Sequence, residues 1–160
     1  MPDAGMDDMT PRRATHDEDW PALLALIRQA FAGMEGRIDP PSSMHRLTPE
    51  AIARQAVEGE IWLIGAPVLA CVFLTPKPDV LYVGKLAVSP LAQRQGHARA
   101  LMAVAEERAR ALGFPALELQ VRVELVENHA TFAALGFRQT AATAHEGYDR
   151  PTSLTFRKPL

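Results

Sequence analysis

One short polar segment has the residue types and spacing to bind a charged ligand: Gln93, Arg94, Gln95, Gly96, His97 and Ala98. An apolar, β-branched stretch (residues 80–88) precedes it, and residues 98–112 follow with apolar side chains at helical spacing. A strand, a glycine-containing loop and a helix make an anion site, because the first amides of a helix have no internal partner and the helix dipole is positive there. Gly96 and Ala98 leave little side chain in front of those amides. The segment predicts a site for a phosphate-bearing ligand, although a tight strand-to-helix turn would show the same pattern.

The amino-acid sequence of this loop resembles a motif of one known family. It lacks the Gly-Lys-Ser/Thr of a P-loop and has one glycine where a dinucleotide fingerprint needs three. It resembles the Q/R-x-x-G-x-G/A signature of the GNAT superfamily, the acetyl-CoA-dependent N-acetyltransferases. A second segment, Asn128-x-Ala130 followed by Leu135-Gly136-Phe137, resembles that family's N-x-x-A…LGF segment, with one residue fewer between Asn and Ala. Two motifs in the family's order argue against a chance match.

The resemblance implies acetyl-CoA as the cosubstrate, held between the fourth and fifth strands of the family's sheet, which splay apart. A splayed strand leaves backbone groups unpaired, and the pantetheine amides can pair with them like an added strand. A backbone N–H there would polarise the thioester carbonyl. The resemblance assigns the pantetheine contacts to Leu86, Ala87, Val88 and Asn128, and the pyrophosphate contacts to the amides of residues 93–98, with a charge-assisted contact from Arg94. Asn128 can also be read as a helix cap.

The implied reaction is the direct attack of a primary amine on the thioester in a ternary complex. A lysine-like amine has a pKa of about 10.4, so a base, a water chain or a desolvated pocket must remove its proton. Many family members protonate the leaving sulfur with a tyrosine in the fourth helix, where this chain has Phe132 beside the cofactor site. Tyr148, Tyr82 and His145 are the candidate proton-transfer groups in its place. Tyr82 is expected to share a strand face with Leu86.

The missing tyrosine leaves a second function open: a catalytically silent acyl-CoA-binding module that acts as a sensor or interaction domain. The acceptor amine is open as well, and a small amine, an amino acid, an antibiotic, a peptide N-terminus or a protein lysine all fit. Arg122, Glu124 and Glu127 could line an acceptor site, but charge on an exposed surface is the simpler interpretation.

The remaining chain predicts the elements that position these residues. Periodicity and turn residues indicate the order β–α–α–β–β–β–α–β–α–β–β, which resembles the GNAT order. We expect a single α/β (α+β) domain over residues 12–160, with a mixed, mostly antiparallel sheet and about four helices, after a loose leader at 1–11. The expected strands are 12–15, 60–64, 68–74, 80–88, 116–121 and 153–158. The expected helices start within 15–19, at 48, at 98 and at 128.

One long irregular segment, residues 32–47, interrupts this pattern. Gly33, Gly36, Pro40 and Pro41 break any helix there. Long irregular loops in compact domains are often functional, so this segment is expected to lie over a site. In the family, the corresponding loop forms one wall of the acceptor pocket.

Composition limits the other possibilities. A formal net charge of −2 over 160 residues argues against nucleic acid as a partner. Cys71 is the only cysteine, which excludes an intrachain disulfide. No apolar run reaches the ~20 residues of a membrane span, and the acidic N-terminus does not resemble a signal peptide, so we expect a cytoplasmic protein without membrane contact. The histidines lack ligand spacing, so no metal is expected. Exposed C-terminal strands would offer a surface for a homodimer.

Overall fold

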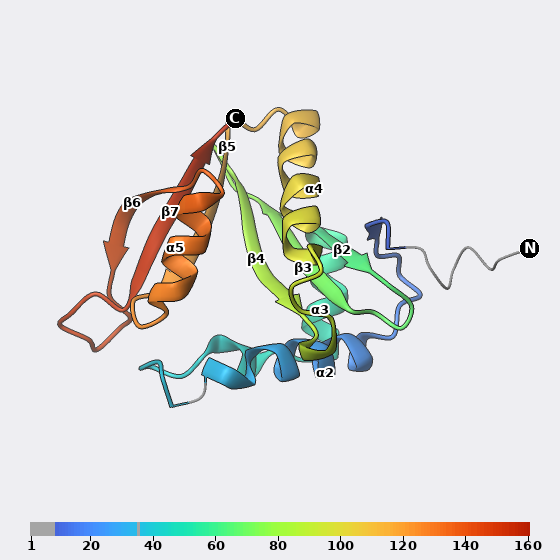
Figure 1. Ribbon diagram of the computed structural model, residues 1–160, viewed down its shortest axis with the longest axis horizontal. Coiled ribbons are helices and arrows are strands. Elements are labelled where there is room, and N and C mark those ends of the chain that lie inside the picture. The colour runs from blue at the N-terminus through green and yellow to red at the C-terminus, as the bar shows by residue number, and fades with distance from the viewer. Residues whose placement is uncertain (1–8, 35) are drawn as a thin grey trace, which may run out of the picture.

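A mixed sheet forms the centre of the computed structural model, which describes residues 9–34 and 36–160. Within those residues the sheet has seven strands in the order β1-β2-β3-β4-β5-β7-β6. All neighbouring strands are antiparallel except β4 and β5 (Figure 1). The strands are β1 (Arg12–Arg13), β2 (Glu60–Ile64), β3 (Ala70–Pro76), β4 (Leu81–Val88), β5 (Ala116–Arg122), β6 (Arg138–Thr143) and β7 (Ser153–Pro159).

Four α-helices accompany this sheet in the described part of the chain, at the expected places. They are α2 (Trp20–Phe31), α3 (Pro49–Glu58), α4 (His97–Leu112) and α5 (Val126–Ala134). Three 3₁₀ turns are η1 (Ala32–Met34), η2 (Ser43–Arg46) and η3 (Pro90–Ala92). The single α/β domain with a mixed, mostly antiparallel sheet is therefore confirmed. Most of the expected leader, residues 1–8, lies outside the described residues.

Local capping signals explain where the helices begin. The Asp19 side chain accepts a hydrogen bond from the Ala22 amide and so caps α2, which places Pro21 in the first turn. Thr48 caps α3 in the same way through the Ala51 amide. Asn128 is not the cap of α5, because that helix already begins at Val126.

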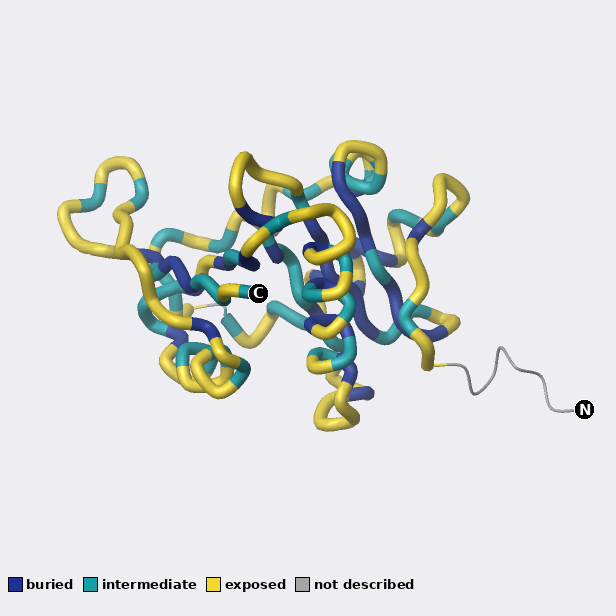
Figure 2. The backbone as a smooth tube through the Cα atoms, turned by 90° about the horizontal axis from the view of Figure 1, so that it is seen from above, coloured by how far each residue is buried: buried dark blue, intermediate teal, exposed yellow. Residues whose placement is uncertain are grey.

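Two apolar layers cover the two faces of the sheet. On one face, α4 contributes the buried residues Leu101, Met102, Ala105 and Ala109, which pack on β3, β4 and β5. On the other face, α2 and α3 pack on β2 and β3 through residues that include Leu23, Ile27 and Ile52. Figure 2 shows buried backbone concentrated in the interior and exposed backbone at the turns. No helix in the described part of the chain is long and apolar enough to cross a membrane.

The two parallel strands separate after a short contact. Only Leu81–Leu117 and Tyr82–Glu118 pair between β4 and β5. Beyond them the strands diverge, which is visible in Figure 1 as the opening between β4 and the group of β5, β6, β7 and α5. This is the splay that the family resemblance implies, and it leaves the β5-facing edge of residues 83–88 without a strand partner in the described sheet.

A bulge in β4 lies inside this opening. Cys71 pairs with Ala87 and Phe73 pairs with Gly84, so β4 has one residue more than β3 over this step. The extra residue reverses the alternation of side chains between the two faces. Leu86 therefore packs with the α4 layer, whereas Tyr82 pairs across to Thr75 on the α3 side. The expectation that Tyr82 and Leu86 share a face is wrong for this reason.

The last strands differ most from what the sequence suggested. Two C-terminal strands were expected, but only the one at 153–158 could be located. All six residues of β6 are exposed, so its sequence has no buried face and no apolar alternation to detect.

Candidate active site

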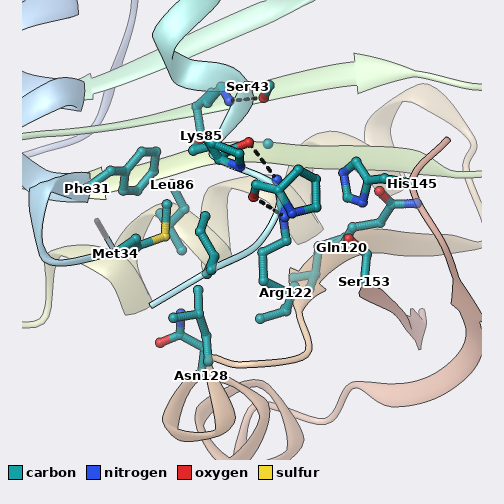
Figure 3. A pocket seen from close by; sticks show the side chains of 18 of the residues that line it. Phe31, Met34, Ser43, Lys85, Leu86, Gln120, Arg122, Asn128, His145 and Ser153 are labelled. Carbon is teal, nitrogen blue, oxygen red and sulfur yellow. Dashed lines mark hydrogen bonds between the residues drawn. The ribbon is translucent and has the colours of Figure 1, made fainter. Parts of the chain in front are cut away.

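The opening between β4 and β5 holds a cavity of about 960 Å³, which we call the central cavity. Its walls come from β4, β5, α5, the 32–47 segment and the loop at 144–152 that joins β6 to β7 (Figure 3). The 32–47 segment, which was expected to lie over a site, therefore lines this cavity. Within residues 9–34 and 36–160, no group of three or more His, Cys, Asp or Glu side chains is arranged to hold a metal ion.

The cavity brings together candidates from distant parts of the sequence. Tyr82 on β4 and His145 and Tyr148 in the 144–152 loop all line it. So do three of the residues assigned to the cofactor: Leu86, Asn128 and Phe132. Ala87, Val88 and residues 93–98 do not line it, because they continue along β4 to the start of α4.

The loop at residues 93–96 has the backbone of an anion site. Arg94 (φ 64°) and Gly96 (φ 84°) both adopt left-handed conformations just before α4. Gly96 is the N-cap, and this position supplies no side-chain hydrogen bond to the first amides of α4. A Cβ built on Gly96 meets no atom within 4 Å, so space is open in front of the amides. The unpaired edge of β4 and this uncapped helix end suit the amides and the pyrophosphate of an acyl-CoA.

His97 has a structural position in this loop. Its side chain is buried, with 7% exposed, rather than open to solvent. Its Nε2 lies 3.3 Å from Gln95 Oε1, so the ring contacts a side chain of the same loop. Its backbone amide is still one of the first N–H groups of α4, which have no carbonyl partner within the helix.

The three proton-transfer candidates have different environments. Burial and the nearby Glu118 raise the pKa of Tyr82. Tyr148 donates a hydrogen bond to Asp39 Oδ1 over 2.6 Å, and this contact raises the pKa of Tyr148. Both phenols are therefore protonated near neutral pH and can serve as acids. His145 contacts the Thr152 hydroxyl through Nδ1, and burial lowers its pKa, so its neutral form can accept a proton.

Sequence reasoning missed several charged residues of the cavity, Lys85 above all. It occupies the β4 bulge with a φ of 45°, and its Nζ donates to Ser43 Oγ over 3.1 Å. Burial lowers the pKa of this amine, and the charge of Arg122 adds to the effect. A lone lysine inside the apolar stretch at 80–88 was the available signal.

A set of polar contacts anchors the 32–47 segment against the far wall. Arg122 on β5 donates to the carbonyl oxygens of Pro40 (2.6 Å) and Pro41 (3.0 Å). The Asp39 amide donates to Glu124 over 3.3 Å. Arg37 pairs with Glu127 at 2.6 Å, and its hydrogen bond lowers the pKa of Glu127 to about 2. Arg122, Glu124 and Glu127 therefore hold the 32–47 segment in place, and of the three only Arg122 lines the cavity.

Comparisons with known proteins agree with this architecture. The model of the acetyltransferase (GNAT) family matches residues 20–137. The chain is similar to the ribosomal-protein-S18-alanine N-acetyltransferase from Escherichia coli, with a TM-score of 0.71 and 19% identity over 94% of this chain and 92% of that one. It is also similar to an acetyltransferase from Streptococcus agalactiae, with a TM-score of 0.74 and 17% identity over 96% and 99% of the two chains.

A third similar structure was solved with a ligand. A GNAT family acetyltransferase from Elizabethkingia anophelis with acetyl-CoA bound has a TM-score of 0.68 and 18% identity over 96% of this chain and 99% of that one. No curated protein sequence matches this chain. Likenesses at these identities establish the fold, and the family model covers most of the sequence. The chain belongs to the GNAT acetyltransferase family.

Proposed function

We propose that this protein transfers an acetyl group from acetyl-CoA to a primary amine by direct attack in a ternary complex. The observation that carries the proposal is the end of β4–β5 pairing at Tyr82–Glu118, which opens the central cavity. That opening lies in the same strand–loop–helix unit as the uncapped N-terminus of α4. Few other uses explain both an unpaired inner strand edge and a helix end left without a cap.

The residues divide into two groups by what they can contact. The backbone of Leu86, Ala87 and Val88 and the amides of residues 93–98 would hold the pantetheine and the pyrophosphate. Asn128 and Phe132 face the same cavity from α5. The 32–47 segment and the 144–152 loop form the remaining walls, so we assign the amine acceptor to that side.

The cavity itself helps to supply a neutral amine. Burial and a neighbouring cation lower the pKa of Lys85. The same two effects would act on an acceptor amine in this space and favour its reactive, uncharged form. His145 is proposed to take the released proton, and Tyr148 or Tyr82 to protonate the departing thiolate.

A catalytically silent acyl-CoA-binding module is the second candidate. Two observations favour it: Phe132 stands where the resemblance places a proton-donating tyrosine, and the hydroxyl of Tyr148 is already engaged by Asp39. Such a protein would bind acyl-CoA without amine-dependent turnover.

Calorimetric titration of the purified protein with acetyl-CoA is the first test, with desulfo-CoA and ATP as controls. Saturable binding of acetyl-CoA, with ATP clearly weaker, would support the cosubstrate assignment. CoA release on addition of amines would then separate the enzyme from the silent module. Absence of both a heat signal and a thermal shift would overturn the proposal.

A further inference from the structure

The central cavity contains a cation, Lys85, that pairs with no carboxylate among residues 9–34 and 36–160. In the described residues, the polar partner of Lys85 Nζ is the neutral hydroxyl of Ser43. The side chain is half-buried and reaches the cavity from the middle of β4, as Figure 3 shows. A half-buried ammonium is costly without a counter-charge, so its retention here calls for an explanation.

A second cation lines the same cavity. Arg122 enters from β5, and its guanidinium is close enough to Lys85 to lower the pKa of that amine. It donates hydrogen bonds to the neutral carbonyl oxygens of Pro40 and Pro41, which hold the guanidinium in place, while the carboxylates of Glu124 and Asp39 act on it through space. Within the described part of the chain, these carbonyls use two of its five N–H donors, which leaves donors that a ligand could use.

The acidic residues nearby are largely engaged with other cations. Asp39 pairs with Arg150 at 3.3 Å, and Glu127 pairs with Arg37 at 2.6 Å. Glu124 lies 4.0 Å from Arg150. Glu146 lines the cavity from the outer loop, where it is exposed. Arg46 adds a further positive charge, so the lysine and arginine side chains of the described lining outnumber its one acidic side chain.

The backbone of Lys85 has an unfavourable conformation at the point where its side chain enters the central cavity. A φ of 45° is unfavourable for a residue with a Cβ, by about 1 kcal/mol or more. The bulge that imposes this conformation brings the ammonium to the side of the sheet where the 32–47 segment and Ser43 lie. Residues held in such conformations cluster at ligand sites.

We infer that the acceptor amine carries a second, anionic oxyacid group, and that Lys85 and Arg122 bind this group while the amine points toward the opening between β4 and β5. This inference rests on the proposed function, since it names the class of acceptor for the same site. Carboxylates and phosphates share the required chemistry, because both accept charge-assisted hydrogen bonds from lysine and arginine.

The test compares matched amines in a CoA-release assay. The first series contains ω-amino carboxylates of increasing chain length, from glycine to 6-aminohexanoate. The second series contains the corresponding aminoalkylphosphonates, and the third, neutral series contains the ω-amino amides. We expect kcat/KM of the best anionic amine to exceed that of its amide about tenfold or more, as a charged hydrogen bond allows. The anionic series with the higher kcat/KM, carboxylate or phosphonate, identifies the kind of anion that the site binds. An amide that reacts as well as its anionic partner would overturn the inference.

Variants of Lys85 test whether this residue causes the preference for anionic over neutral amines. Lys85→Met should bring the ratio of kcat/KM for the anionic amine to kcat/KM for its neutral amide close to one. The change should come mainly from a higher KM for the anionic amine. Lys85→Arg should restore much of the ratio, since it returns the charge. Lys158→Met is the matched control, because Lys158 pairs with Glu106 at 2.9 Å outside the cavity and should leave the ratio unchanged. A ratio that survives Lys85→Met would contradict the assignment.

A binding measurement keeps the inference testable if no amine in the panel is acetylated. Wild-type protein is labelled briefly with acetic anhydride, and the modification of Lys85 and Lys158 is read by mass spectrometry. Butyrate or propylphosphonate should slow labelling of Lys85 but not of Lys158, and butyramide should protect neither. Equal labelling of Lys85 with and without the anions would reject the anion site. Failure to bind acetyl-CoA in calorimetry would instead reject the proposed function.

Discussion

The hydroxyl of Tyr148 lies 2.6 Å from the Asp39 carboxylate and donates a hydrogen bond to it. This contact joins the 144–152 loop to the 32–47 segment, two pieces of chain that are 109 residues apart at this point. It closes one side of the central cavity. It also holds the phenol in its protonated form, because a neighbouring carboxylate raises its pKa.

If Tyr148 is the acid that protonates the leaving thiolate, Tyr148→Phe should lower kcat by about 10- to 100-fold. The affinity for acetyl-CoA should stay nearly the same, since the backbone sites on β4 and α4 are untouched. Single-turnover rates and calorimetry measure the two quantities separately.

Asp39→Asn is the matched control for that variant, because it keeps the hydroxyl and removes the charge. The pKa of Tyr148 should then fall from its raised value, so the alkaline limb of the pH–rate profile should move to lower pH. The rate near neutral pH should change only a few-fold. If both variants instead raise KM for the amine equally and leave kcat alone, the hydroxyl serves to hold the two loops together and not to transfer a proton.

Gly96→Glu should sharply weaken acetyl-CoA binding, by about 100-fold or more, because it puts a carboxylate in the open space before the α4 amides. Strain must be separated from this effect, since Gly96 has a φ of +84°. Gly113→Glu supplies the comparison: Gly113 ends the same helix with a φ of +86° and similarly open space. Both variants should lose similar stability, about 1–2 kcal/mol, in thermal unfolding. Unchanged acetyl-CoA affinity in Gly96→Glu would count against the pyrophosphate assignment.

Phe132→Tyr should raise kcat, by about tenfold, if a proton donor is missing at this position on α5. The ring lines the central cavity and meets Phe137 edge-on, with centroids 5.9 Å apart. Phe137→Tyr is a useful contrast, because that ring is only 2% exposed and a hydroxyl there would be buried. It should cost about 1–3 kcal/mol of stability with no gain in rate. A folded Phe132→Tyr protein with unchanged kcat would show that the thiolate obtains its proton elsewhere.

Glu60 makes a buried ion pair that should govern stability in acid. Its carboxylate is 6% exposed and accepts from Arg108 Nε (2.8 Å) and Nη2 (2.7 Å). Burial alone raises the pKa of Glu60, but hydrogen bonds from Arg108 and Trp62 outweigh it and hold the pKa below the ordinary value of 4.5. A lowered pKa stabilises the fold above 4.5, and this contribution disappears as the pH falls through the folded-state value.

Glu60→Gln should therefore lower the free energy of unfolding at pH 7 by about 2 kcal/mol. The difference from wild type should shrink as the pH falls below 4.5, where Glu60 becomes protonated first in the unfolded chain and, at lower pH, in the folded protein. Urea unfolding at a series of pH values measures this. Glu58→Gln, at an exposed position in the last turn of α3, should change stability by less than about 0.5 kcal/mol. If the difference in unfolding free energy between wild type and Glu60→Gln stays constant across this pH range, the charged Glu60–Arg108 pair is not the source of that difference.

The features that the sequence predicted correctly depend on local signals. The strand–loop–helix unit from 80 to 112 follows from apolar periodicity and from glycines at Gly96 and Gly113, both of which adopt left-handed backbone. Thr48 and Asp19 define helix starts through contacts only three residues long. Such interactions act within one turn of chain, so residue type and spacing are enough to anticipate them.

The parts that were missed depend on register and on long-range contact. The bulge at Lys85 exists only because Cys71 and Phe73 on β3 take the register they do, and that single extra residue decides which face Tyr82 and Leu86 occupy. Strand β6 is held by backbone pairing to β7 and has no apolar pattern of its own.

By itself, the sequence determined the family, most of the order of the elements and the strand–loop–helix unit at 80–112, since these are properties of neighbouring residues. Only the tertiary structure decided what surrounds the opening between β4 and β5. Arg122 reaches Pro40 across 82 residues, and Lys85 reaches Ser43 across 42. The charge of the cavity comes from side chains that the packing of the sheet and its loops brings together. These residues are far apart in the sequence, so no local sequence pattern predicts that charge.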